Sequence, residues 1–376
     1  TGAMAQDQVL GKRSAGDSDD RELPTLNEDE AKLYDRQIRL WGVEAQSRMR
    51  RSRVLMAGLG GLMGEACKNL VLAGIGTAYL LDARVVQEQD LAAQFFLTPE
   101  DIGKNRAEAS VARVQELNPR VEVVVDTAPL ESKDAAFFEG FDVVCITESP
   151  DLALTIRVNE WCHSAQVPFF AGDLQGLYGF LFMDHVGHRF TEKVTQRTRK
   201  QQKAGEGDEL LLEEEEETLV DVTSTVACPT LEAALRQSPW GARRMRKVAK
   251  HFFATAIVLE YRSAKAAGKA EGKDLAAFQQ EYLASRDVDA SFVPLELTQT
   301  LHKCHCVDLN PVAAIVGGIL GQEVIKVLSA KSKPLLNFFL FDGAKGPGYV
   351  ELVEPASATA AAAAAAAAPP ADIVCL

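Results

Sequence analysis

Short apolar runs alternate with longer stretches of mixed polarity along the first half of the chain. The apolar runs predict β-strands, at 53–57, 77–81, 121–126, 142–147 and 167–171. The stretches between them predict helices, near 61–73, 103–117 and 150–164. Because strands that alternate with helices lie side by side beneath a helical cover, this pattern predicts an α/β fold with a doubly wound, mostly parallel, Rossmann-like sheet.

The second half has a different pattern. Residues 176–183 predict an antiparallel hairpin strand, and 219–300 predict mainly helices. Residues 308–328 are apolar on every side, which is typical of a buried helix. Two further strands are expected, at 336–341 and 348–353.

A helix is also expected before the first strand. Asn27 and Glu30 have the spacing of a capping box, in which each side chain accepts a hydrogen bond from the other residue's backbone N–H group. The helix is expected to continue to Arg51. Its apolar face would be formed by Leu33, Ile38, Leu40 and Trp41.

These patterns divide the chain into six segments. The expected order is a disordered tail at 1–25, the first part of the α/β domain at 26–192, a charged disordered loop at 193–218, a mainly helical insertion at 219–300, the second part of the domain at 301–354, and a disordered Ala/Pro-rich tail at 355–376. The loop is expected because the basic block Lys193–Lys203 and the acidic block Glu213–Glu217 cannot bury apolar surface. The basic block is alternatively a nuclear-import sequence.

Composition narrows the possible functions. The 376 residues carry a net charge of −13, and a surface of that sign repels the phosphates of nucleic acid. The apolar runs are taken as shorter than the ~20 residues that span a bilayer, so no membrane partner is expected. The seven cysteines lack the spacing of a disulfide framework, which favours a reducing cytosolic or nuclear compartment.

The strand at 53–57 leads into a glycine-rich turn, Gly58-Leu59-Gly60-Gly61-Leu62-Met63-Gly64. Such turns let the backbone approach phosphate closely at the start of a helix. Gly58 and Gly60 fit the first two glycine positions, whereas Met63 stands where a third is usual. Asp82 ends the second strand, where an acid commonly binds ribose hydroxyls. The turn alone is equally compatible with a nucleotide site and with a scaffold that binds nothing.

Longer motifs give a more specific indication. The chain resembles the smaller, adenylation-silent subunits of heterodimeric SUMO-activating enzymes, within the ubiquitin-activating family that has a ThiF/MoeB-type adenylation fold. The resemblance covers about 28–351 except the loop at 195–217. It is carried by Tyr34–Gly42 (YDRQIRLWG), Gly103–Ser110, Asn310–Lys326 and Phe338–Gly343. It implies that 219–300 is a reduced form of the domain that bears the catalytic cysteine.

The chain departs from the catalytic members of this family where they hold ATP. Their Ser-Asn-Leu-Asn-Arg-Gln-Phe run, whose Asn and Arg bind phosphates, corresponds here to Gln89–Phe95, so that Ala92 and Ala93 replace the two phosphate ligands. A methyl group offers a phosphate no donor, whereas arginine offers a charged fork. The magnesium aspartate falls at Pro150, and Asp151 is one position away.

The resemblance therefore implies that this chain binds no cofactor and no metal. Gly58, Gly60, Asp82 and Lys104 would be vestiges of a nucleotide site, in which Arg106 replaces a second lysine. ATP and Mg²⁺ would be used by the larger, catalytic partner subunit.

Arg36, on the N-terminal helix, is the candidate catalytic residue. The resemblance implies that it reaches into the partner's ATP site in trans, as arginine fingers do. Arg39, three residues later, lies on much the same helix face. The alternative for Arg36 is a surface salt bridge, for instance with Asp35.

Two other segments carry reactive side chains. Cys228-Pro229 superficially suggests a thioester cysteine, but the silent subunits have a Cys-Pro here without that role. The sequence His302-Lys303-Cys304-His305-Cys306 suggests metal, but a closed zinc site usually needs a second ligand pair. A core or interface segment is the preferred interpretation.

The resulting hypothesis is a non-catalytic but required subunit of an obligate heterodimer that adenylates the SUMO C-terminus and transfers it to the partner's cysteine. The expected location is nuclear and also cytoplasmic. The alternatives are a subunit for another modifier, such as the neddylation activator, an independent adenylyltransferase or dehydrogenase, and a scaffold in which Arg36 enters no site.

Overall fold

The computed structural model describes residues 26–201, 213–236, 248–305, 307–353 and 373–374. The tail expected at 1–25 and most of the tail expected at 355–376 lie outside the described residues. The described end of that second tail is a short strand, β11 (Ile373–Val374), antiparallel to β10 (Gly348–Glu351). The prediction of a tail without structure is therefore wrong at these two residues.

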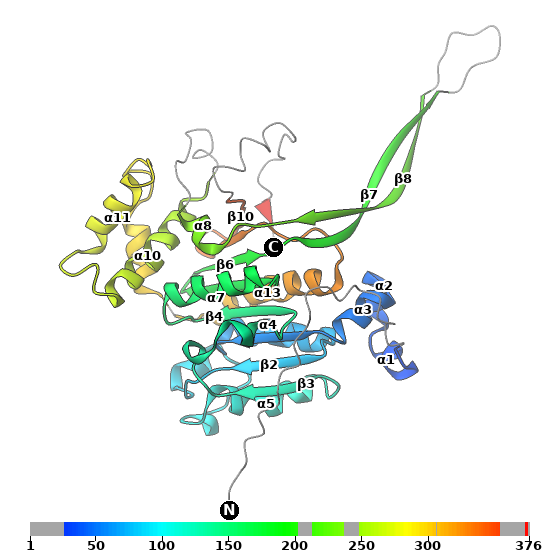
Figure 1. Cartoon of the computed structure of the whole chain (residues 1–376), viewed down its shortest axis with the longest axis horizontal. Helices are drawn as coiled ribbons and strands as arrows, with labels where there is room; N and C mark the ends of the chain where they lie inside the picture. Colours follow the sequence, from blue (N-terminus) through cyan, green and yellow to red (C-terminus); the bar gives the residue numbers. More distant parts are fainter. Residues whose placement is uncertain (1–25, 202–212, 237–247, 306, 354–372, 375–376) are drawn as a thin grey trace, which may run out of the picture.

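A nine-stranded sheet forms the centre of the molecule, in the order β11-β10-β9-β6-β5-β4-β1-β2-β3 (Figure 1). The parallel strands are β3 (Glu122–Asp126), β2 (Thr77–Leu81), β1 (Arg53–Ala57), β4 (Val143–Thr147) and β5 (Phe169–Gln175). Antiparallel pairing continues through β6 (Tyr178–Asp184) and β9 (Phe338–Asp342). The predicted doubly wound α/β fold is confirmed, and the hairpin strand after β5 is antiparallel as expected.

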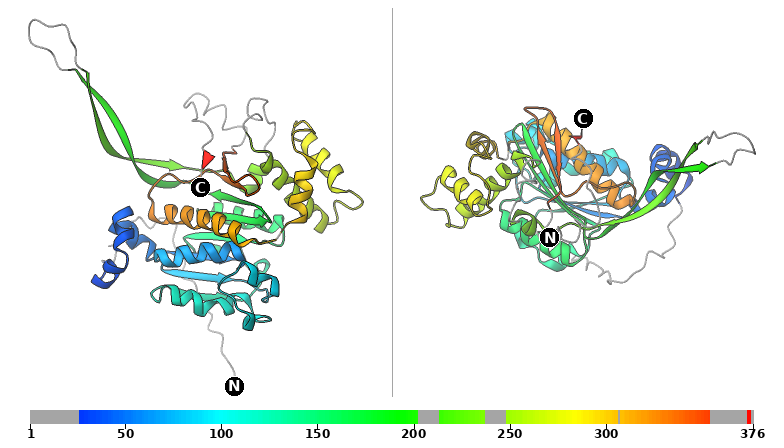
Figure 2. Two further views of the ribbon diagram at one scale, coloured as in Figure 1. Left: turned by 180° about the vertical axis from the view of Figure 1, so that it is seen from behind. Right: turned by 90° about the horizontal axis from the view of Figure 1, so that it is seen from above.

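Helices cover both faces of this sheet (Figure 2). One core contains α4 (Gly61–Ala73), α5 (Arg106–Leu117) and α13 (Asn310–Ser329). The other contains α7 (Leu152–Ser164), α8 (Leu231–Leu235), α10 (Lys250–Ala266), α11 (Leu275–Ala284) and α12 (Leu295–Lys303). Strand side chains alternate between the two cores: in β1, Leu55 belongs to one and Met56 to the other.

Helix α13 packs directly on α4. A Cβ atom at Gly317 would lie 2.6 Å from the Cβ of Glu65 and 2.7 Å from the backbone oxygen of Leu62, so only glycine fits there. Gly318 has nothing within 4 Å. Among the described helices, α13 is long and apolar enough to span a membrane, contrary to our reading of the apolar runs. Most of it is buried inside the protein, as in a core helix.

The N-terminal helix is divided into three: α1 (Glu28–Leu33), α2 (Asp35–Trp41) and α3 (Val43–Met49). The capping box of Asn27 and Glu30 is present as predicted. The single continuous helix was wrong, because Gly42 has φ +89° and separates α2 from α3. The apolar face was also wrong, since Leu33 and Leu40 are 55% and 80% exposed.

The charged segment at 193–218 is the largest correction. β7 (His188–Gln201) and β8 (Glu213–Val226) form a two-stranded antiparallel sheet that projects from the body (Figure 1). The register sets the basic block opposite the acidic one, with Arg199 opposite Glu215. Each charged block alone is typical of a loop, but the two blocks compensate each other's charge when they pair as neighbouring strands. The mainly helical insertion accordingly begins at Leu231 and not at 219.

The buried His251 makes stability depend on pH. Burial lowers the pKa of His251 from 6.5 to about 4. Its ring packs against the ring of Tyr178, and neither of its ring nitrogens has a hydrogen-bond partner. Since the unfolded chain takes up the proton first, stability is lost as pH falls from 6.5 towards 4, by up to about 3 kcal/mol. We expect His251→Phe to reduce this loss in urea titrations at pH 4.5 and 7. An unchanged pH dependence would contradict the prediction.

Candidate functional site

The glycine turn after β1 lies against the end of β4. Gly58 has φ +84°, and a Cβ atom there would lie 2.0 Å from the backbone oxygen of Thr147. The hydroxyl of Thr147 donates to the backbone oxygen of Gly58 at 2.6 Å. Both residues are at the carboxyl ends of parallel strands, which is where open α/β sheets bind their ligands. The turn therefore has the geometry of a nucleotide site.

Asp82 lies at the carboxyl end of β2 and is 4% exposed. Its carboxylate accepts from the backbone N–H of Leu59 at 2.8 Å and from the guanidinium of Arg84 at 3.1 and 3.2 Å. Burial acts to raise the pKa of Asp82, but the hydrogen bonds from Arg84 and the charges of Arg84 and Arg106 hold it below its usual value. The carboxylate that could bind ribose is thus bonded within the chain.

Glu148 occupies the space beside the turn. A Cβ atom at Gly60 would lie 2.1 Å from its Oε1 atom, so the carboxylate lies directly against the glycine backbone. Its Oε2 atom accepts from Arg106 at 2.9 Å and pairs with Arg84 at 2.6 Å. Glu148 has φ +48°, a conformation that costs a residue with a side chain on the order of 1 kcal/mol or more. The two arginines of the site are therefore engaged by this carboxylate.

Asp308 comes from the segment before α13 and binds the start of α4. Its Oδ2 atom accepts from the backbone N–H of Gly61 at 2.8 Å, and Leu62 donates to the same carboxylate. A helix N-terminus is where a phosphate would be held in a nucleotide site. Burial and the charge of Glu148 raise the pKa of Asp308 to about 6. This carboxylate takes the phosphate's place on the helix.

A cleft of about 710 Å³ extends from this point. It is lined by three carboxylates (Asp90, Glu148 and Asp308) and two guanidiniums (Arg84 and Arg106). The cleft therefore repels a triphosphate more than it attracts one. Ala92 and Ala93 also line the cleft, and their methyl groups offer a phosphate no hydrogen-bond donor.

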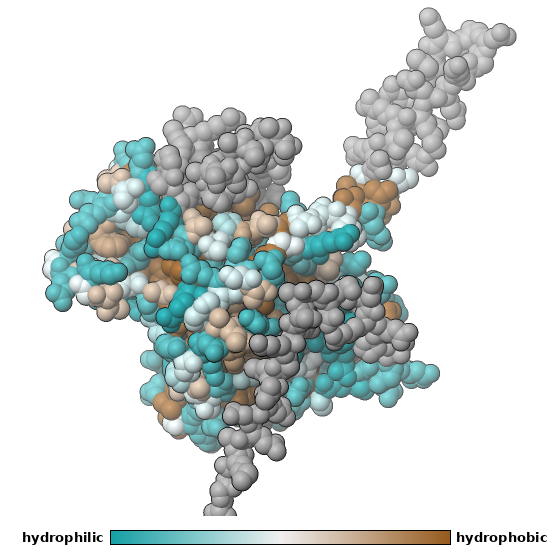
Figure 3. All heavy atoms as spheres, in the orientation of Figure 1, coloured by the Kyte–Doolittle hydropathy of each residue, from teal (hydrophilic) through white to brown (hydrophobic). Residues whose placement is uncertain are grey.

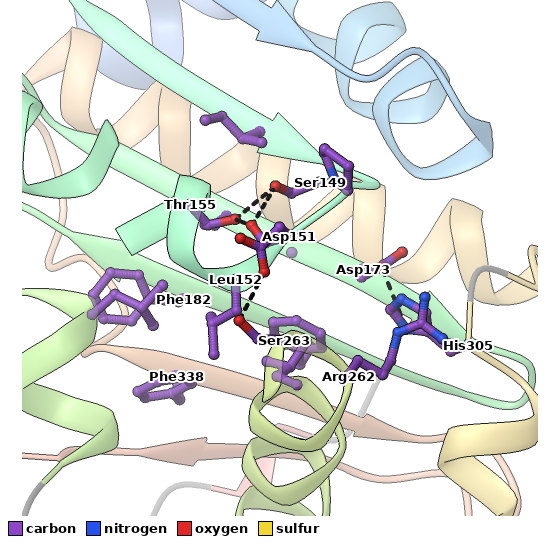
Figure 4. A pocket seen from close by; sticks show the side chains of 17 residues that line it. Ser149, Asp151, Leu152, Thr155, Asp173, Phe182, Arg262, Ser263, His305 and Phe338 are labelled. Atoms are coloured by element: carbon purple, nitrogen blue, oxygen red, sulfur yellow. Dashed lines mark hydrogen bonds and ion pairs between the residues drawn. The ribbon is translucent and has the colours of Figure 1, made fainter. Parts of the chain in front are cut away.

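The other predicted vestiges are dispersed. The ammonium of Lys104 pairs with Asp101 at 2.9 Å and lines no part of this cleft. Pro150 lines the adjoining cavity of about 310 Å³. Asp151 accepts from the hydroxyl of Ser263 on α10 at 2.8 Å, on the side of a smaller apolar cavity (Figure 4). The carboxylate of Asp151 is thus bonded to α10.

Arg36 lies far from this cleft. Helix α3 ends at Met49 and β1 begins at Arg53, so α1–α3 lie at the amino ends of the parallel strands. The cleft lies at their carboxyl ends, and a strand of five residues spans about 17 Å. Arg36 is exposed and forms no ion pair with another described residue, because the nearby Asp35 pairs with Arg39 at 2.9 Å. Asp35, the partner considered for Arg36, thus forms its salt bridge with Arg39 instead.

The surroundings of Arg36 are firmly held. Tyr34 is 1% exposed, and its hydroxyl accepts from Asn118 at 2.8 Å. Glu30 pairs with Arg50 at 2.7 Å. These contacts fix α1 and α2 against the body while Arg36 points into solvent.

Neither Cys228 nor the described part of the 302–306 segment forms a catalytic or metal site. Cys228 is 5% exposed, which does not suit a nucleophile. His305 has a pKa lowered to about 4, chiefly by burial, and its Nδ1 atom is 3.7 Å from a carboxylate oxygen of Asp173. Cys306 lies outside the described residues. Within the described residues no group of three or more His, Cys, Asp or Glu side chains could hold a metal ion.

Sequence reasoning missed Glu148 and Asp308. They are 160 positions apart and belong to no motif, so only the fold brings them to the same turn. The acidic residue directly after β4 was the one available indication for Glu148.

Comparison with known proteins gives consistent matches. The model of the ThiF family matches residues 34–359. SUMO-activating enzyme subunit 1 of Rattus norvegicus is 40% identical over 342 residues, covering 88% of this chain and 96% of the relative. The Homo sapiens protein of that name is 37% identical, covering 88% and 97%, and the Danio rerio protein is 38% identical, covering 89% and 98%.

Two solved structures share the fold. E. coli MccB with MccA-N7isoASN has a TM-score of 0.53 at 13% identity, covering 89% of this chain and 74% of that one. MccB with succinimide has a TM-score of 0.51, covering 86% and 72%. At this identity the likeness concerns the fold alone.

Asp308 provides a test of the carboxylate cluster. Because its pKa is raised from 3.8 to about 6, its ionisation destabilises the folded state as pH rises from about 4 through 6, by up to about 3 kcal/mol. We expect Asp308→Asn to unfold at higher urea than the parent at pH 7.5. The difference should vanish near pH 4, whereas the exposed Asp29→Asn should show little change at either pH. A destabilised Asp308→Asn at pH 7.5 would contradict the raised pKa of Asp308 and its cause in burial and the charge of Glu148.

Proposed function

Because the chain belongs to the ThiF family and is a homologue of SUMO-activating enzyme subunit 1, we propose that it is the non-catalytic but required subunit of a SUMO-activating enzyme. In this proposal a larger partner subunit carries the ATP site and the thioester cysteine. The SUMO C-terminal carboxylate attacks the α-phosphate of ATP there, pyrophosphate leaves, and the cysteine thiolate then displaces AMP.

One observation supports the non-catalytic role most strongly. The backbone donors and arginines that would hold a nucleotide in this chain are bonded to its own carboxylates, those of Asp82, Glu148 and Asp308. ATP and Mg²⁺ are accordingly assigned to the partner. The partner would form an obligate heterodimer with this chain, and the location would be nuclear and cytoplasmic.

Arg36 is the residue that we assign to the shared reaction. Its position at the edge opposite the cleft of its own chain, its exposure and its lack of an ion-pair partner among the described residues support a role in another subunit. A guanidinium next to ATP would stabilise the charge that develops on the phosphates as pyrophosphate leaves.

The isolated chain should not catalyse SUMO-dependent exchange between ATP and pyrophosphate. The cleft lacks phosphate ligands at Ala92 and Ala93 and holds three carboxylates where a triphosphate would bind. The measurement uses radiolabelled pyrophosphate with the purified chain, and the heterodimer serves as the positive control. Robust exchange by the single chain would disprove the non-catalytic role.

Arg36→Ala should slow SUMO adenylation by the heterodimer by about 10- to 1,000-fold, on the smaller side of what an arginine supplied in trans contributes. Folding and pairing should be unchanged, because an exposed helix position tolerates alanine. Arg36→Lys should recover only part of the rate, since an ammonium lacks the planar fork. Single-turnover assays of adenylation measure this effect.

The matched control is Lys32→Ala, which removes an exposed positive charge from α1 and should leave adenylation unchanged. Thioester formation from preformed SUMO adenylate should be nearly normal in Arg36→Ala, because ATP is already consumed. Normal adenylation by an intact Arg36→Ala heterodimer would favour the scaffold alternative instead.

A further inference from the structure

The strands β7 and β8 form an arm with little support from the rest of the protein. They pair with each other and with no strand of the large sheet. Thr191 is hydrogen-bonded to Ala330 and Ser332 at the base of the arm. From Thr191 to Gln201, the end of β7, the strand extends about 33 Å. A two-stranded ribbon alone is marginally stable in water, so such an arm needs a surface to lie against.

One face of the arm carries a stripe of valines. The register places Val194 opposite Val220 and Val222 opposite Glu192, so the three valines and Glu192 share a face. Val194 is 41% and Val222 38% exposed. The space-filling view shows apolar atoms on the described part of the arm (Figure 3).

The opposite face is different in character. It carries Lys193, Asp221, Thr195 and Leu219, a mixture of charged and polar side chains with one exposed leucine. The valine face is therefore the side of the arm that gains more from being covered by another surface.

The arm is joined to the helices that carry Arg36. Arg48 of α3 donates a hydrogen bond to the backbone oxygen of Ser329 at the end of α13. The next residues bind the arm: Thr191 donates its N–H to Ala330 at 3.0 Å, and Ser332 donates to Thr191 at 3.1 Å. Ala330 and Ser332 both have positive φ, so a tightly constrained turn links the two elements.

Helices and arm also lie at the same end of the molecule. The arm base and α1–α3 are near each other in all three ribbon views (Figures 1 and 2). Exposed apolar side chains occur on both, with Leu33 and Leu40 on the helices and Val194 and Val222 on the arm. A subunit that receives Arg36 must lie against this end.

We propose that the valine face of the β7–β8 arm docks on the larger catalytic subunit, the same subunit that receives Arg36. The inference rests on the proposed function, because that function identifies the partner. The arm adds affinity to the heterodimer, whereas Arg36 acts on the adenylation rate.

The test measures the dissociation constant of the heterodimer formed with the larger SUMO-activating subunit. Val194→Lys and Val222→Lys should each raise it about 10-fold or more, as buried contact residues do. The control Leu219→Lys changes a residue that is 69% exposed on the other face of the same strand, and it should shift the constant less than about twofold. Val222→Thr, which keeps the β-branched shape, should give an intermediate loss.

Hydrogen exchange provides a second readout that needs no variant. Backbone amides of β7 and β8 should exchange more slowly in the heterodimer than in the free chain. At saturating partner, the Val222→Lys heterodimer should adenylate SUMO at the parent rate, whereas Arg36→Ala should pair normally and adenylate slowly.

The outcomes separate the two proposals. Unchanged dissociation constants for both valine variants, or unchanged exchange in the arm, overturn the docking inference and leave the proposed function intact. An equal loss in Leu219→Lys overturns the assignment of the face. A parent chain that does not pair with the larger subunit overturns both proposals.

Discussion

Each backbone N–H group of the glycine turn can donate to one negatively charged group, and in this chain the acceptors are carboxylates of the protein itself. Leu59 donates to Asp82, and Gly61 donates to Asp308. The carboxylate of Glu148 lies directly against Gly60. The turn also lies in contact with the end of β4, through Gly58 and Thr147. The fold keeps the geometry of a nucleotide site and gives its donors to the protein itself.

The same carboxylates determine the state of the two arginines. Arg106 is 4% exposed and pairs with Glu148 and Asp90, so its charge is compensated inside the protein. Removing one member of such a buried network leaves another charge uncompensated, which is costly. An incoming phosphate would have to displace Glu148 from both Arg84 and Arg106. The proposal of a silent site therefore rests on these ion pairs as well as on the alanine at position 93.

Much of the fold could be predicted from local pattern, and the exceptions have physical causes. The strands of short apolar runs, the helices between them and the capping box of Asn27 depend on neighbouring residues and were predicted. The arm at 188–226 depends on two charged blocks that become compatible only when paired across the ribbon. The break at Gly42 depends on one backbone angle. Glu148 and Asp308 are 160 positions apart, and the fold brings them together. The local pattern of apolar and polar residues cannot predict such a contact.

A parallel sheet separates the two ends of its strands by the length of a strand, so that the cleft and Arg36 lie on opposite sides of the fold. The carboxyl edge holds the cleft, where Arg84 and Arg106 are paired with carboxylates of the same chain. The amino edge holds Arg36 on helices fixed by Tyr34 and Glu30. The strands between the two edges are largely buried. The proposed loss of nucleotide binding at the carboxyl edge is therefore compatible with the proposed role of Arg36 at the amino edge.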